Sequence, residues 1–318
     1  VLLVPKFSAI RSRSAVDTGT DLVKGIRLHI PILSANMDTI TEARMAIAMA
    51  QQGGIGILHR FMSIADQAEQ VERVKRAESM VVEKPITIRL QSTVAEARQK
   101  MVESDVGGLL VVDGENHLLG LITNRDVLLA QDADEPILTV MTPKERLITA
   151  GPDEPLDSAR HTLYKHRLEK LPLVDGEGRV AGLITAQDII KIQQHPNATK
   201  DSRGRLRVGV ALGVRSDDIQ RAEACLNAGA DVFLVDIAHG HSNHTIRMVE
   251  RLKKRWPQVP VIAGNVAAPD GVRDLAAAGA DAVKVGVGAG SICITRVVTG
   301  FGVPQLTAVA ECAEVGHQ

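Results

Sequence analysis

Residues Ala278–Arg296 read AGADAVKVGVGAGSICITR, and this stretch decides the fold. Its opening Ala-Gly-Ala-Asp is typical of a helix end that leads directly into a strand, because glycine adopts the left-handed conformation common at helix C-termini. The run Ala282–Val285 then predicts a buried strand, and a glycine-rich loop follows it. The same four residues occur at Ala228–Asp231, again before an apolar run at Val232–Ile237. Helices that alternate with buried strands predict an α/β fold with a parallel sheet.

Short apolar runs and helical stretches alternate along both flanks of the chain. The predicted strands cover residues 30–33, 54–58, 206–214, 232–237, 261–266 and 282–287, and the predicted helices cover residues 41–52, 217–228, 244–256, 269–278 and 306–314. Six strands are too few to close an eight-stranded α/β barrel. Either the sheet is open or further strands lie beyond Gln318, and we expect the second. The start at Val1 rather than Met, and the end within a predicted helix, lead us to expect that both ends of the natural protein lie outside this sequence.

The composition excludes several function classes. The 37 basic and 38 acidic residues give a net charge of -1, which predicts no nucleic-acid partner and no membrane-surface attraction. Aromatic residues are scarce, which argues against stacking on single-stranded bases. No apolar run approaches the length of a membrane span. Three scattered cysteines, without a signal peptide, predict a cytoplasmic protein rather than a disulfide framework.

An internal repeat separates the two flanks. Leu118–Asp126 matches Val180–Asp188 at an offset of 62 residues, and the same offset aligns Val112–Glu115 with Val174–Glu177. We therefore expect residues 80–198 to form their own domain, inserted between the barrel parts 1–79 and 199–318. Each repeat ends in a strand, a threonine, and an aspartate three residues later: Thr123 with Asp126, and Thr185 with Asp188. The aspartates serve either as helix N-terminal charges or, with the threonines, as a grip on a ribose.

The loop Gly286–Arg296 presents a cysteine in a setting suited to chemistry. Alternate glycines let a backbone approach a ligand closely, and Ser291 adds a hydroxyl suited to a phosphate. Thr295 places a second hydroxyl two residues after Cys293. A cysteine on such a loop is placed for nucleophilic attack, whereas a structural cysteine is usually sealed in apolar packing. We expect Cys225 and Cys312 to be of that second, helix-packing kind.

Several motifs together resemble the inosine monophosphate (IMP) dehydrogenase and GMP reductase family, with IMP dehydrogenase the nearer match. They are the cysteine loop, Asn36-Met37-Asp38-Thr39 with Thr41-Glu42, Asp236–Ser242, Gly264-Asn265-Val266, the run Asp201–Gly213 and the helix Gln67–Ser79. The central repeat looks like a pair of CBS motifs, the α+β (Bateman) module that this family inserts after its second barrel strand. The resemblance implies a (β/α)8 TIM barrel with an inserted CBS pair. It extends over essentially the whole chain.

The resemblance also implies a reaction and a set of site residues. Cys293 would attack C2 of IMP and hydride would pass to NAD, leaving a covalent thioimidate that water hydrolyses with help from Thr295. The expected residues for the substrate are Ser291, Gly290, Met37 and Asn36; for the cofactor Asp236, Asn265, His239 and Lys284; for a K⁺ ion the carbonyls of Gly288, Gly290 and Cys293; and for an ATP- or GTP-type regulatory nucleotide Thr123, Asp126, Thr185 and Asp188. The family forms homotetramers, which CBS pairs can stack into octamers.

Alternatives to this interpretation stay open on the sequence. A GMP reductase, which uses NADPH to convert GMP to IMP, shares the barrel and the cysteine loop. A catalytically inactive nucleotide sensor is a third reading, which the intact Cys293 and Thr295 argue against. Asp236 could instead cap the helix near His244, and Asn265 could be a turn residue. A zinc site at His239, His241 and His244 is disfavoured, because their spacing is poor for ligands on one helix face.

Overall fold

The computed structural model describes residue 2 and residues 4–78, 81–130 and 132–316. Within them the chain divides into two compact units, one of residues 1–77 and 197–318 and one of residues 78–196. The predicted junction between residues 79 and 80 lies outside the described residues.

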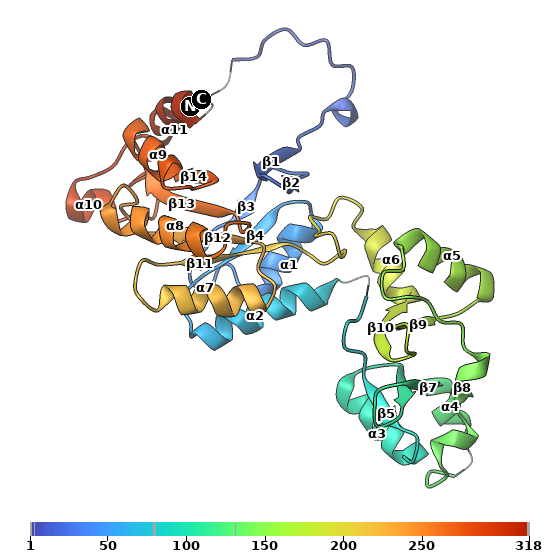
Figure 1. The fold of residues 1–318 in the computed structure, drawn as a ribbon. Coiled ribbons are helices and arrows are strands. Elements are labelled where there is room, and N and C mark those ends of the chain that lie inside the picture. The colour runs from blue at the N-terminus through green and yellow to red at the C-terminus, as the bar shows by residue number, and fades with distance from the viewer. Residues whose placement is uncertain (1, 3, 79–80, 131, 317–318) are drawn as a thin grey trace. The chain divides into compact units, whose positions relative to one another are not determined.

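The first unit contains a six-stranded, wholly parallel sheet whose strands follow one another in chain order (Figure 1). Its strands are β3 (Leu33–Ser34), β4 (Ile55–Leu58), β11 (Val208–Leu212), β12 (Val232–Asp236), β13 (Val261–Val266) and β14 (Ala282–Val285). Its helices are α1 (Ala43–Gln51), α2 (Ile64–Ala77), α7 (Asp218–Asn227), α8 (Asn243–Arg255), α9 (Pro269–Ala277), α10 (Thr295–Thr299) and α11 (Gln305–Gly316). The α/β class and the parallel sheet are confirmed.

Alternate residues of each strand enter two different cores, because successive side chains of a strand point to opposite faces. In β12, Phe233 and Val235 pack in the cluster shared with the helices. Val232 and Leu234 pack in a second cluster, with Ile55 of β4 and Ile262 of β13 among its members. The sheet therefore has one face covered by helices and another that encloses its own apolar interior.

The N-terminal region differs from the prediction. The strand expected at residues 30–33 is observed at Leu33–Ser34, which pairs with β4, whereas Ile30 and Pro31 lie in a bend. Pro31 lacks the amide hydrogen that a sheet ladder needs, which accounts for the shorter strand. A hairpin of β1 (Thr20–Val23) and β2 (Ile26–Leu28) was not predicted, and its Val23, Ile26 and Leu28 join the inner cluster.

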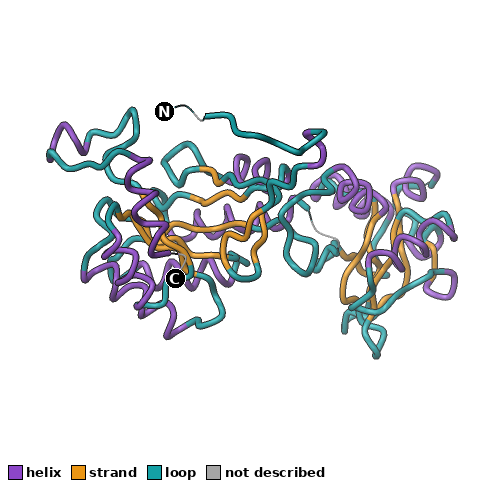
Figure 2. Tube along the Cα trace, turned by 90° about the horizontal axis from the view of Figure 1, so that it is seen from above, coloured by secondary structure: helices purple, strands orange, loops and turns teal. Residues whose placement is uncertain are grey.

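Residues 78–196 contain two similar halves, in which Figure 2 shows strands in orange flanked by helices in purple. The first half comprises β5 (Thr87–Arg89), α3 (Val94–Ser104), β6 (Gly108–Val112), β7 (Leu118–Thr123), α4 (Asn124–Leu129) and β8 (Thr142–Pro143), and the second comprises α5 (Leu156–His166), β9 (Lys170–Val174), β10 (Val180–Thr185) and α6 (Ala186–Gln194). Each half has an antiparallel pair, β6 with β7 and β9 with β10, that runs into a helix through the threonine of the repeat. The internal repeat of the sequence therefore appears as a repeat of structure.

Candidate active site

Parallel strands all end at one edge of the first unit's sheet, and predicted site residues gather there. Asn36 follows β3, Asp236 ends β12, Asn265 lies in β13, and the Cys293 loop follows β14. In α/β barrels this carboxyl edge carries the active site. The strand order therefore brings together residues that are far apart in the sequence.

A hydrogen-bonded network joins four predicted site residues, Asn36, Asp236, Asn265 and Lys284 of β14. Lys284 Nζ donates to Asp236 Oδ1 at 2.9 Å and to Asn265 Oδ1 at 2.8 Å. Asn36 Nδ2 donates to the second carboxylate oxygen of Asp236 at 2.9 Å. Adjacent strands lie about 4.8 Å apart, so β3 and β12, three places apart in the order, would be separated by about 14 Å in a flat sheet. The contact between Asn36 and Asp236 shows that the sheet is curled.

The network fixes the orientation of each polar group at the edge. Asp236 is not a helix cap, because Ser242 caps α8 by accepting from the amide of Thr245. Asn265 does make turn-like backbone contacts, since its amide donates to Ile237 O and its carbonyl accepts from Gly240 N. Its side chain remains directed at Lys284. A carboxylate, an amide and an ammonium therefore converge on one point, with both acceptors oriented by the same cation.

The cysteine loop is shaped by its glycines. Gly288 has a φ of 71°, in the region that favours glycine, and a Cβ there would meet Gly302 Cα and Phe301 O at 2.9 Å. Arg296 Cγ would lie 3.0 Å from the same Cβ. The loop is thereby held against residues 301–302, and α10 begins two residues after the cysteine at Thr295. The close packing explains why side chains are excluded at this point.

Cys293 is partly exposed and lies beside a hydroxyl. Its Sγ is 3.3 Å from Thr295 Oγ1. The hydrogen bonds from the Thr295 side chain and backbone, helped by the charge of Arg296, lower the pKa of the Cys293 thiol. Burial raises the pKa of Cys225 to about 12, and it also raises the pKa of Cys312. Of the three cysteines, Cys293 is therefore the one whose thiolate form is favoured. Cys225 and Cys312 are buried among packed side chains, as predicted.

The remaining predicted substrate and cofactor residues are open to solvent. Ser291, Gly290 and His239 are exposed, and 46% of Met37 is exposed. The predicted cation carbonyls lie in the same loop, where Gly290 O accepts the amide of Cys293 at 3.1 Å. Among the described residues no group of three or more histidine, cysteine or acidic side chains could hold a metal ion, and His241 instead pairs with Asp274.

In the second unit, the threonines and aspartates of the repeat contact each other. Thr123 Oγ1 donates to Asp126 Oδ2 at 2.7 Å, and Thr185 Oγ1 donates to Asp188 Oδ2 at 2.5 Å. Both aspartates also accept the backbone amide of their threonine. Each pair therefore caps a helix.

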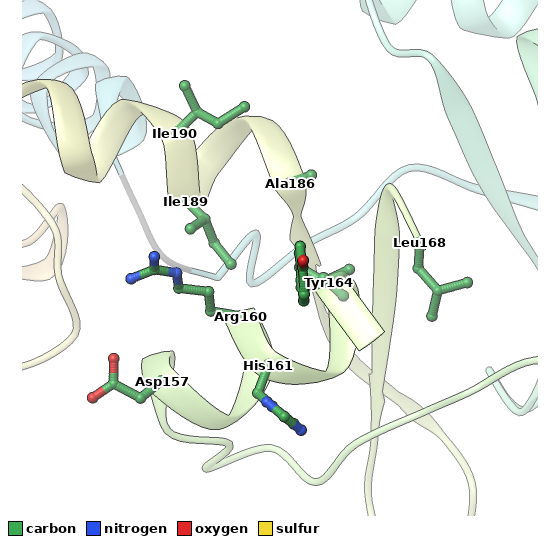
Figure 3. A pocket seen from close by; sticks show the side chains of 9 residues that line it. Asp157, Arg160, His161, Tyr164, Leu168, Ala186, Ile189 and Ile190 are labelled. Atoms are coloured by element: carbon green, nitrogen blue, oxygen red, sulfur yellow. The ribbon is translucent and has the colours of Figure 1, made fainter. Parts of the chain in front are cut away.

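A groove of about 560 Å³ lies between α5 and α6 of this unit (Figure 3). Ile189 and Ile190 of α6 line one side, and Arg160, His161 and Tyr164 of α5 line the other. Neither Thr185 nor Asp188 is part of its lining. Ala186 and Ile189, the next residues in the chain, do line it, so the groove adjoins one of the predicted Thr–Asp pairs without including it.

One group at the carboxyl edge of the sheet was not predicted. His59 follows β4 directly and is 2% exposed, with Asp38 and Glu42 near its ring. Its position immediately after a buried strand was the available signal, because polar side chains at strand ends meet at the same edge. The sequence motif around Asp38 was recognised, but its spatial partner was not.

Comparison with known proteins agrees with this geometry. A family model described as "IMP dehydrogenase / GMP reductase domain" matches residues 1–318. The inosine-5′-monophosphate dehydrogenases of Nitrosopumilus maritimus and Aquifex aeolicus are 52% and 50% identical over 317 and 319 residues. The alignments cover 100% of this chain and 66% and 65% of those relatives, so the chain spans just under two thirds of their length.

Solved structures give the same family by a separate route. The crystal structure of GMP reductase from Trypanosoma brucei in complex with guanosine 5′-triphosphate superposes with a TM-score of 0.91 and 45% identity. The superposition covers 99% of this chain and 76% of the T. brucei chain. A variant of that enzyme in complex with guanosine 5′-monophosphate also gives a TM-score of 0.91, over 68% of its chain. None of the helices in the described part of the chain is long and apolar enough to cross a bilayer. The chain belongs to the IMP dehydrogenase / GMP reductase family.

Proposed function

We propose that the protein is an IMP dehydrogenase, which oxidises IMP to xanthosine monophosphate in guanine nucleotide biosynthesis. The observation that carries the proposal is Cys293, a partly exposed cysteine whose thiol pKa is lowered beside Thr295. Two relatives at 52% and 50% identity over this whole chain are inosine-5′-monophosphate dehydrogenases. The thiolate is the competent nucleophile for a purine C2.

The chemistry follows from the residues at the edge of the sheet. The Cys293 thiolate attacks C2 of the hypoxanthine ring, and the hydrogen at C2 leaves as hydride, which leaves a thioimidate between the sulfur and the purine. Water then adds to C2, the C–S bond breaks, and the sulfur returns to Cys293. The Thr295 hydroxyl is placed to stabilise the thiolate by donating to it and to assist the hydrolytic water. The Ser291 hydroxyl and the loop amides around Gly290 would hold the 5′-phosphate, as amides in glycine-rich loops commonly do.

The network around Lys284 fits a dinucleotide. NAD, when bound, accepts the hydride from C2. Asp236 offers carboxylate oxygens suited to ribose hydroxyls, Asn265 offers an amide suited to the carboxamide, and exposed His239 lies nearby in the chain. The Lys284 ammonium orients both polar acceptors. The donor set of the cysteine loop, the backbone carbonyls of Gly288, Gly290 and Cys293, is chemically suited to K⁺, which takes oxygen ligands.

The architecture supports further parts of the proposal. The curled sheet favours a TIM barrel closed by two more strands, and the structural repeat favours a CBS pair. A guanine nucleotide bound to the T. brucei relative supports a regulatory ATP- or GTP-type ligand for the Thr–Asp pairs of that repeat. We also propose a homotetramer, stackable into an octamer, and a cytoplasmic location, which the free cysteines favour.

GMP reductase is the second candidate, favoured by the 45% identity to the T. brucei enzyme. Absorbance at 340 nm separates the two reactions. The proposal predicts NADH formation with IMP plus NAD, and no NADPH consumption with GMP plus NADPH. Consumption of NADPH in the second mixture alone would establish the reductase, and silence in both mixtures would favour a nucleotide sensor.

A further inference from the structure

His59 is a buried histidine whose backbone is fixed on both sides. It directly follows β4, its amide donates to Thr41 O, and its carbonyl accepts from the side chain of Gln67. Thr41 is fully buried, and its hydroxyl donates to Ala35 O. The histidine and the segment before α1 are therefore held together by main-chain contacts.

The tautomer of His59 follows from its neighbours. The Phe61 amide donates to Nδ1 at 3.1 Å, so Nδ1 must be the unprotonated nitrogen of the neutral ring. The proton is consequently on Nε2, which makes this nitrogen a donor. Nε2 is buried and has no hydrogen-bond partner. A buried donor without a partner is costly, so an acceptor that moves within range would stabilise the protein.

Two carboxylates lie just outside hydrogen-bonding distance of His59 Nε2. Asp38 Oδ1 is 3.7 Å and Glu42 Oε1 is 3.6 Å from His59 Nε2. Asp38 lies in the turn that follows Asn36 and Met37, whereas Glu42 stands directly before the first residue of α1. A shift of the turn by less than one ångström would bring the Asp38 carboxylate within range.

The turn itself is strained, which makes a second arrangement accessible. Thr39 has a φ of 57°, and the left-handed region is unfavourable for a β-branched residue. The turn is closed by Met37 O, which accepts the amides of Ile40 and Thr41. Backbone strain of this kind is found at ligand clamps and switches, where two arrangements compete.

We propose that His59 is a positioning residue for the substrate turn: when a purine nucleotide occupies the site beside Asn36 and Met37, the turn shifts and the Asp38 carboxylate accepts Nε2–H. The inference rests on the proposed function, because it takes Asn36 and Met37 as the substrate side of the site. The new hydrogen bond satisfies the buried donor and stabilises the nucleotide-bound arrangement of the turn. The role of His59 is exerted through Asp38.

The test measures nucleotide affinity and stability in the same variants. His59→Phe removes the donor, so the dissociation constant for IMP, or for GMP if the wild-type protein prefers it, rises about three- to tenfold, the range that one hydrogen bond supplies. The variant loses the unpaired Nε2 donor and also the Nδ1 acceptor of the Phe61 amide, so its melting temperature without nucleotide changes little, whereas a merely structural role would lower it. His59→Gln retains a donor and an acceptor and restores part of the affinity. His29→Phe, at an exposed histidine beside the start of β4, is the matched control and leaves the affinity unchanged.

Hydrogen exchange of residues 38–42 supplies the direct readout. Nucleotide addition protects these amides in the wild-type protein but not in His59→Phe or Asp38→Ala. If His59→Phe binds the nucleotide with unchanged affinity, this inference alone is overturned. It is likewise overturned if affinity falls in Glu42→Ala but not in Asp38→Ala. Failure of the wild-type protein to bind either nucleotide overturns both this inference and the proposed function.

Discussion

At the scale of single residues, the reactivity of Cys293 comes from its immediate neighbours in the chain. Thr295 and Arg296, two and three residues away, act on the thiol, and both could be read from the sequence. The role of Cys293 as a candidate nucleophile was therefore predictable. The Asn36–Asp236 contact was not, since it depends on the curl of a sheet that joins residues 200 positions apart.

The hydroxyl of Thr295 should control how readily Cys293 reacts. Thr295 lowers the thiol pKa, and the thiolate predominates above that pKa, so Thr295→Val raises the pKa and reduces the thiolate fraction at neutral pH. The rate of iodoacetamide alkylation, followed by mass spectrometry against pH, should shift to higher pH in this variant. Thr299→Val, which removes another hydroxyl of α10, is the control and should keep the wild-type profile.

The same experiment has an internal reference. Cys225 and Cys312 are buried with raised pKa values, so the native protein should be alkylated at Cys293 long before either of them. Equal labelling of all three cysteines, or an unchanged pH profile in Thr295→Val, would contradict this account of the loop.

At the scale of elements, two helices carry matched lysine–aspartate contacts. Lys75 of α2 donates to Asp231, which also accepts the amide of Val208 at the start of β11. Lys253 of α8 donates to Asp281, which accepts the amide of Val261 at the start of β13. Both aspartates end an Ala-Gly-Ala-Asp motif. The two sites differ in burial, because Lys75 is 5% exposed and Lys253 is 23% exposed.

This difference predicts unequal effects on stability. Lys75→Met leaves the largely buried Asp231 without its lysine partner and leaves Asp201 paired with Arg205, which should lower the free energy of unfolding by about 3–5 kcal/mol. Lys253→Met should lower it by about 1 kcal/mol, since water can solvate Asp281. Urea unfolding followed by circular dichroism measures both values. Equal losses in the two variants would show that burial is not the deciding factor.

The elements themselves were predicted unevenly. β13 was predicted with its observed bounds. The ends of α7, α8 and α9 lie within one residue of the predicted ends. Apolar periodicity and the Ala-Gly-Ala-Asp ends carry that information locally. The β1–β2 hairpin was missed, because its short strands are defined by packing into the inner cluster rather than by a long pattern.

At the scale of the whole molecule, we expect the compact unit of residues 78–196 to make the protein's stability respond to nucleotides. GTP or ATP should raise the melting temperature, since a ligand that binds only the folded state stabilises it. Asp126→Asn with Asp188→Asn keeps helix-capping oxygens but removes both charges, and should abolish the shift. Differential scanning fluorimetry measures the melting temperature with and without nucleotide. An unchanged nucleotide-induced shift in the double variant would contradict the prediction. The internal repeat can be read from the sequence, whereas the contacts within its Thr–Asp pairs depend on the three-dimensional structure.

The most direct test of the central claim, that Cys293 forms a covalent purine intermediate, is intact-protein mass spectrometry after an acid quench of enzyme, IMP and NAD. The account predicts a species heavier by one purine nucleotide, located at Cys293 by peptide mapping and missing in Cys293→Ala, which also loses turnover. Wild-type turnover in Cys293→Ala, or an adduct on any other residue, would contradict it.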